Sequence, residues 1–170
     1  MFRKQLILLG ILSGILLAIL GTLALIGGSI PEKHQVISSD IIEHKQAKVW
    51  EHISNISKLA EWNPSISKVE SIKGKEGHWQ EFYATGDSMT YETVSLKPPF
   101  EMVRQIADDK APFQGRWTIS LKALSPEQTE ITIIEDGSIE NPFLRFMVHH
   151  FIGPDKFQRS YIDSLKAGIK

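Results

Sequence analysis

The clearest indication of the fold lies in residues 113–121, which read FQGRWTISL. Apolar residues and one glycine occupy the odd positions of this stretch, and polar residues occupy the even positions. Because successive side chains of a strand point to opposite faces, the alternation predicts a strand with one buried and one solvated face. Gly115, between Phe113 and Trp117, is expected to leave space on the buried face.

The same period of two continues on both sides of this strand. A turn at residues 125–126 leads into a second strand at residues 129–139, TEITIIEDGSI, where Ile131, Ile133 and Glu135 share one face. An apolar row therefore ends in a carboxylate. Upstream, similar alternation predicts strands at residues 36–43, 66–72, 78–84, 88–96 and 100–107. A short helical insertion is predicted at 46–55, with a further turn at 57–61.

A long C-terminal helix is predicted to begin at Asn141, a capping residue, and Pro142, which is favoured at the first helical position. Its buried stripe is expected to comprise Phe143, Leu144, Met147, Val148, Phe151 and Ile152. Gly153 and Pro154 then break or kink the helix. Beyond the break, the apolar positions at i, i+4 spacing are Phe157, Tyr161 and Leu165.

The N-terminal part of the chain has a different character. Leu6 to Ile30 contains no Asp, Glu, Lys or Arg. As a helix this stretch would be about 37 Å long, against a hydrocarbon core of about 30 Å, so we expect a transmembrane helix. A cleaved signal peptide is the alternative, but its apolar core is usually shorter and ends in a small-x-small site. The expected division is therefore a membrane anchor with its linker at residues 1–33 and one soluble domain at residues 34–170.

Charge bears on topology and on partners. Arg3 and Lys4 precede the apolar stretch and Glu32 and Lys33 follow it, which favours a single-pass protein with an extracytoplasmic domain. Counting outward to residue 48 adds further lysines and nearly balances the two sides. The chain has 19 Lys and Arg against 20 Asp and Glu, without a basic run among aromatic residues, so no nucleic-acid partner is expected.

The order of these segments predicts an α+β fold in which a curved antiparallel sheet grips a long C-terminal helix. Five short motifs occur in sequence along these segments. They are Ala47-Lys48-Val49-Trp50, Trp62-Asn63-Pro64, Gly115-Arg116-Trp117, residues 129–132 and Asn141-Pro142. In these features the chain resembles the START-like superfamily, also called SRPBCC, and within it the polyketide cyclase/dehydrase-like group. The resemblance covers about residues 36–165. It implies a helix-grip fold around an apolar cavity that binds a lipid or another hydrophobic small molecule, and it implies no shared catalytic motif.

The predicted alternation selects candidate cavity residues. Aromatic and sulfur-containing candidates between sheet and helix are Trp79, Tyr83, Trp117, Phe143, Met147 and Phe151, with Gly115 as the source of space. The alternative for each is a place in a filled core. Glu81 and Glu135 share strand faces with bulky apolar residues, so each is either a cavity acid or a residue that a bulge returns to water. Arg104 and Arg145 are the expected counter-charges.

Several classes of site lack their sequence signatures. His149 and His150 are adjacent on the predicted helix, about 100° apart, so they cannot bind one metal from a single face. The chain has no cysteine and no metalloprotease, phosphate-loop or dinucleotide motif, and we expect neither metal nor cofactor. The favoured function is a membrane-tethered binding module for a lipid or hydrophobic molecule. Alternatives are a cyclase- or hydrolase-like enzyme with unknown catalytic residues, or a protein-interaction domain with a closed core.

Overall fold

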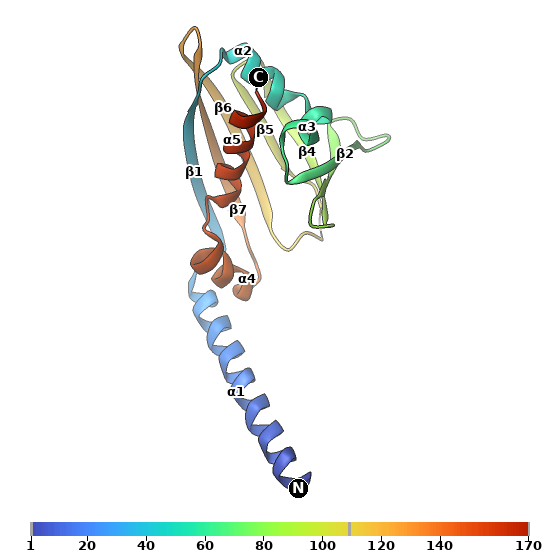
Figure 1. Ribbon diagram of the computed structural model, residues 1–170, viewed down its shortest axis with the longest axis vertical. Coiled ribbons are helices and arrows are strands. Elements are labelled where there is room, and N and C mark those ends of the chain that lie inside the picture. Colours follow the sequence, from blue (N-terminus) through green and yellow to red (C-terminus); the bar gives the residue numbers. More distant parts are fainter. Residues whose placement is uncertain (1, 109, 170) are drawn as a thin grey trace. The chain divides into compact units, whose positions relative to one another are not determined.

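The computed structural model of the chain describes residues 2–108 and 110–169 and resolves two compact units (Figure 1). One unit contains the residues up to Glu32 together with Ile139–Gly153. The other contains Lys33–Ser138 and the residues from Pro154 onward, and is called the sheet unit below. The grouping of residues 139–153 with the N-terminal helix was not expected, and the division into an anchor at residues 1–33 and a domain at residues 34–170 stays a prediction.

Across the described residues, seven antiparallel strands form one curved sheet in the order β1-β7-β6-β5-β4-β3-β2. The strands are β1 (Lys33–Ile42), β2 (Ile66–Ser71), β3 (His78–Tyr83), β4 (Ser88–Lys97), β5 (Glu101–Ile106), β6 (Gln114–Ser125) and β7 (Gln128–Ser138). The helices of the sheet unit are α2 (Gln46–Ser54), a 3-10 turn η1 (Ile56–Lys58), α3 (Leu59–Trp62) and α5 (Lys156–Gly168). The predicted α+β helix-grip architecture is confirmed.

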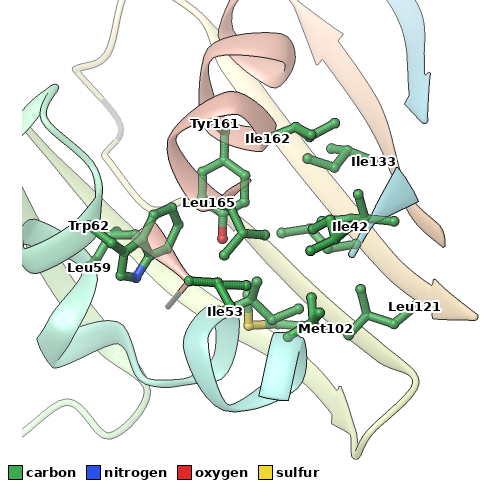
Figure 2. Packing of buried hydrophobic residues seen from close by; sticks show 14 of the residues in the cluster. Ile42, Ile53, Leu59, Trp62, Met102, Leu121, Ile133, Tyr161, Ile162 and Leu165 are labelled. Carbon is green, nitrogen blue, oxygen red and sulfur yellow. The ribbon is translucent and has the colours of Figure 1, made fainter. Parts of the chain in front are cut away.

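The hydrophobic core lies between the concave face of the sheet and the helices α2, α3 and α5. Ile119 of β6 stands opposite Met102 of β5 and Ile133 of β7, so three neighbouring strands present apolar side chains at one level. Figure 2 shows Tyr161, Ile162 and Leu165 of α5 packed over this surface. The period-two pattern therefore predicted the buried face of the central strands correctly.

The predicted strands all appear, with shifts at their ends. β1 begins at Lys33 and not at residue 36, because its pairing with β7 continues as far as Ser138. β6 runs on to Ser125, which still pairs with Gln128 across the turn. Phe113 was expected on the buried face of this strand, but it lies before β6 and is exposed.

The predicted buried stripe of the C-terminal helix is wrong for its first half. The helix is divided into α4 (Pro142–Met147), a π-helical turn η2 (Val148–Ile152) and, after a break at Gly153, α5. A π turn changes the angular spacing of side chains, so positions three and four apart no longer share one face. Phe143 and Phe151 are 43% and 69% exposed, and Arg145 is the buried residue of α4.

Other features of this region agree with the sequence. The side chain of Asn141 caps α4 by accepting hydrogen bonds from the backbone N–H groups of Phe143 and Leu144, at 2.9 and 3.1 Å. The break falls at Gly153, whose φ of 87° suits glycine. In α5, Tyr161 and Leu165 are buried as predicted, whereas Phe157 is exposed.

The N-terminal residues form the helix α1 (Phe2–Ser29). Residues Gln5–Ser29 are long and apolar enough to cross a membrane, judged by length and composition. Apolar side chains such as Leu9, Leu17 and Leu25 are exposed along the helix.

Candidate functional site

Arg104 is the centre of a polar cluster beneath α5. It lies on β5, is only 7% exposed, and places its Nη1 atom 3.7 Å from Glu81 Oε1. The guanidinium carbon lies 4.8 Å from the ring centre of Trp117 and 4.8 Å from that of Tyr161. A third ring, that of Tyr91, lies 6.0 Å away. The buried cation is therefore stabilised by one carboxylate and by the electron-rich faces of aromatic rings.

Glu81, on β3, is 4% exposed and is held by hydrogen bonds. Its Oε1 accepts from Trp79 Nε1 at 2.9 Å, and its Oε2 accepts from the hydroxyl of Tyr83 at 3.4 Å. The hydroxyl oxygens of Tyr83 and Tyr91 are 2.5 Å apart. A buried carboxylate is costly unless it is paired and hydrogen-bonded, and Glu81 meets both conditions.

Glu135, on β7, forms the other end of the cluster. Its Oε2 accepts a hydrogen bond of 2.7 Å from Trp117 Nε1, and its Oε1 lies 3.5 Å from Nε2 of His34 on β1. A Cβ atom at Gly137 would overlap the ring of His34, so glycine is required for the histidine to approach the carboxylate. A Cβ at Gly115 would make only ordinary contacts, 3.8 Å from Glu135 Oε1.

Strand register explains why these residues meet. Trp117 stands opposite Arg104 on one side and opposite Glu135 on the other, while Trp79 stands opposite Tyr91. Directly opposed side chains of antiparallel strands lie about 5 Å apart at Cβ and share a face. The sheet therefore carries the cluster across five strands, from β7 through β6, β5 and β4 to β3, and Tyr161 covers it from α5.

Burial sets the protonation states of the tyrosines. Burial raises the pKa of Tyr161 to about 12, although the nearby Arg104 opposes the shift. Burial, and then the charge of Glu81, raises the pKa of Tyr91 to about 12. The pKa of Tyr83 is also raised, chiefly by burial. Burial lowers the pKa of Arg104, but the neighbouring Tyr161 and Glu81 raise it more. At neutral pH the cluster therefore contains protonated hydroxyl groups and a guanidinium cation.

Some buried polar atoms of this region lack a hydrogen-bond partner within the described residues. They are Arg104 Nη1, the hydroxyl of Tyr161, Trp62 Nε1, Ser38 Oγ and Gln158 Oε1. An unpaired buried donor or acceptor costs about 1 to 3 kcal/mol, so proteins rarely leave several together without a reason. Three of the five belong to Arg104, Tyr161 and Trp62, and the ring of Tyr161 contacts both the indole of Trp62 and the guanidinium of Arg104.

Two open hollows border the cluster. One, of about 560 Å³, lies where β1 and β6 begin and β5 and β7 end, and its lining includes His34, Ile106, Gly115 and Gly137. The other, of about 600 Å³, adjoins Trp79, Thr93 and the turn between β2 and β3. Both lie within the sheet unit and give solvent access to residues that touch the cluster.

The sequence-predicted candidates fall into two groups. The structure brings together the six candidates that lie on strands, namely Trp79, Glu81, Tyr83, Gly115, Trp117 and Glu135. Phe143, Met147 and Phe151 lie in the other compact unit, and a cavity role for them stays a prediction. His149 and His150, in η2, are exposed, with ring centres 4.7 Å apart.

Of the two arginines expected as counter-charges, one lies beside a carboxylate of the cluster. Arg104 does accompany Glu81, but Arg145 pairs with Glu32, at 3.5 Å, and with neither Glu81 nor Glu135 among the described contacts. His34 lies beside Glu135. Sequence reasoning also missed Tyr91 and Tyr161 as members of the cluster. The period-two pattern of β4 places Tyr91 on the concave face, but its partner on β3 depends on the hairpin register.

We predict that replacing Glu81 by glutamine destabilises the sheet unit by about 3 kcal/mol, because Arg104 then stays buried without an anion. Urea unfolding can be followed by tryptophan fluorescence, since all four tryptophans lie in this unit. Glu70→Gln is the matched control: Glu70, on the neighbouring β2, pairs with Lys68 at an exposed position and should contribute less than about 1 kcal/mol. Equal small losses in both variants would contradict the assigned burial of charge.

A second prediction concerns alkaline pH. All three tyrosines of the chain have raised pKa values, so the folded protein should form little tyrosinate as pH passes 10. The unfolded chain ionises near pH 10, so the free energy of unfolding should fall as pH rises from about 10 to about 12. Absorbance at the tyrosinate band measures this, with the chain in concentrated guanidinium chloride as reference. Superimposable titrations of folded and unfolded protein would show that the hydroxyl groups are not buried.

Comparison with known structures agrees with the fold. A conserved protein from Geobacillus kaustophilus superimposes with a TM-score of 0.68 at 15% identity, covering 80% of this chain and 95% of that one. A START superfamily protein from Mycobacterium smegmatis gives 0.62 at 13% identity, covering 80% and 97%. The Zhui aromatase/cyclase from Streptomyces sp. R1128 gives 0.61 at 15% identity, covering 81% and 92%. At these identities the likeness concerns the fold alone.

Sequence comparison gives the family. No curated protein is similar enough in sequence to match the chain. The family described as polyketide cyclase / dehydrase and lipid transport matches residues 42–159, which include β2 to β7, α2, α3 and the start of α5. Because this match covers well over half of the 170 residues, the chain belongs to the polyketide cyclase / dehydrase and lipid transport family.

Proposed function

We propose that the sheet unit binds a hydrophobic small molecule, such as a lipid, that carries an uncharged oxygen-containing group. The observation behind this proposal is that Nη1 of Arg104 and the hydroxyl of Tyr161, both buried beside aromatic rings, have no hydrogen-bond partner among the described residues. A carbonyl or hydroxyl oxygen of a ligand would accept from either donor, and the rest of the ligand would contact apolar surface. The family and a START superfamily neighbour support a role of this class.

The charges of the cluster favour a neutral polar group over an anionic one. Arg104 already faces Glu81, and Glu135 adds a second carboxylate at the other end of the cluster. An anionic head group would gain from one cation but would approach two carboxylates in a poorly solvated place. Because Arg104 Nη1 and the Tyr161 hydroxyl are covered in this state, binding requires a local opening beside one of the two hollows.

Catalysis of a cyclase type is the second candidate, and the Zhui aromatase/cyclase shares the fold. The hydrogen-bonded row of Glu81, Tyr83 and Tyr91 offers a path along which a proton could move. However, an efficient acid or base has a pKa near the working pH, and the pKa of Tyr91 is about 12. Binding is therefore favoured over proton transfer by the tyrosines.

The membrane tether is part of the same proposal. The helix α1 has the length and composition of a membrane span, and the positive residues before it favour a sheet unit outside the cytoplasm. A reporter enzyme that is active only outside the cytoplasm, fused after residue 170, should then be active. A stable but inactive fusion would reverse the proposed topology.

Gly115 provides the test of ligand binding. Gly115→Leu should occupy the part of the hollow next to Glu135 and remove co-purifying molecules, because the leucine side chain extends well beyond the 3.8 Å contacts of a Cβ. Gly115→Ala is the control, since a Cβ alone fits, and it should keep the bound molecules. Mass spectrometry of organic extracts from the detergent-solubilised proteins measures both.

Thermal melts of the same proteins distinguish a ligand site from a filled core. If no protein carries a bound molecule and Gly115→Leu loses about 1 to 3 kcal/mol, the substitution has overpacked a closed core and the binding proposal fails. Unchanged bound molecules in Gly115→Leu would place any ligand elsewhere.

A further inference from the structure

Arg145 fastens residues 139–153 to the end of α1. Its Nε donates to the carbonyl oxygen of Gly27 at 2.9 Å, and its Nη1 donates to the carbonyls of Ile139 and Glu140 at 2.8 and 2.9 Å. The carboxylate of Glu32 lies 3.5 Å from the same Nη1 atom. The last carbonyls of a helix lack helical partners and carry partial negative charge, so a guanidinium suits this position.

Gly27 allows the two segments to approach closely. A Cβ atom at this position would overlap the backbone of Pro142, the first residue of α4. Small residues permit the same kind of close contact between helices in membranes. The backbone N–H of Ile139 also donates to the carbonyl of Glu32 at 2.9 Å. Residues 139–153 are therefore fixed at the last turn of α1 by side-chain, backbone and packing contacts.

The fastened segment presents apolar side chains that are largely exposed. Phe143 is 43% exposed and Phe151 is 69% exposed, while the rings of Phe146 and Phe151 lie 5.8 Å apart. Within the same compact unit, Leu25 near the end of α1 is 78% exposed. Both α1 and the segment attached to its end therefore expose apolar side chains.

The depth of this surface in a bilayer follows from the length of α1. The apolar stretch of α1 measures about 37 Å as a helix, and the hydrocarbon core of a bilayer is about 30 Å thick. When α1 spans the core, Gly27 and its partners lie near the boundary between acyl chains and head groups. Short segments with exposed phenylalanines bind at that depth by inserting their apolar face.

We propose that residues 139–153 are a second membrane contact, an interfacial segment held against α1 by Arg145 and Gly27, with Phe143 and Phe151 inserted among the lipids. This inference rests on the proposal that α1 crosses a membrane. The membrane anchor then comprises two segments that are in contact in space but more than 100 residues apart in the sequence.

Quenching by lipids tests this contact in the full chain. The protein has no cysteine, so Phe151→Cys and Leu25→Cys each give one site for a fluorescent label. The labelled proteins are reconstituted into phosphatidylcholine vesicles with or without lipids that carry a spin label on the acyl chain. We expect the label at residue 151 to lose most of its fluorescence, as the label at residue 25 does, while the dye coupled to free cysteine keeps its signal.

The outcomes separate this inference from the tether itself. Quenching at residue 25 without quenching at residue 151 would overturn the second contact, as expected if a protein partner covers the phenylalanines, and would leave the tether intact. Absence of quenching at both sites would show that α1 is not in the bilayer.

A pair of glycine variants tests how the segment is positioned. In the labelled Phe151→Cys protein, Gly27→Val should displace α4 and reduce quenching, whereas Gly28→Val should not, because a Cβ at Gly28 meets no atom within 4 Å. Equal quenching in both variants would contradict the role assigned to Gly27.

Discussion

The buried guanidinium of Arg104 restricts how the strands of the sheet unit can pair. Removing a cation from water costs several kcal/mol, and the carboxylate of Glu81 at 3.7 Å compensates only when both strands keep their register. A shift of one residue in β5 would turn Arg104 to the opposite face of the sheet and leave Glu81 buried without its cation. The aromatic rings of Trp117 and Tyr161 add stabilisation that also depends on the positions of β6 and α5. Burial of one charge thus selects a single arrangement of four elements.

This requirement separates two regions beneath α5. Around Ile119, Ile133 and Leu165 the side chains are apolar and fully buried, and they account for the stability of the fold. Around Arg104 the same concave face carries charged and hydroxyl groups, some without partners. A core filled with charged groups is often no more stable than one filled with apolar residues of similar volume. The unpaired donors of this region are the observation behind the proposed recognition of a polar group on an otherwise apolar molecule.

Local patterns were sufficient to predict most of the fold, because alternation in stretches such as residues 113–121 directly reflects one buried face. The same patterns placed Glu81 and Glu135 among apolar neighbours. They could not identify His34 as the partner of Glu135, since that contact depends on the register of β1 against β7 and on the missing side chain of Gly137. From residue 148 the predicted C-terminal stripe failed because a π turn, which has no clear sequence signature here, interrupts the helical period. Arg145 was misassigned because its hydrogen-bond partners are backbone carbonyls, which no side-chain pattern reveals, and its ion-pair partner is Glu32.

The pairing of β1 with β7 has a consequence for biosynthesis. Lys33 pairs with Ser138, so more than 100 further residues must be synthesised before the partner of β1 is complete. At about 5 to 20 residues per second, this interval is roughly 5 to 20 seconds for a nascent chain. During that time the apolar residues Val36, Ile37, Ile41 and Ile42 belong to a segment without its strand partner, and unpaired apolar strand segments readily associate with other chains. We therefore expect the yield of this sheet to depend on how well residues 33–42 are kept from other chains during synthesis.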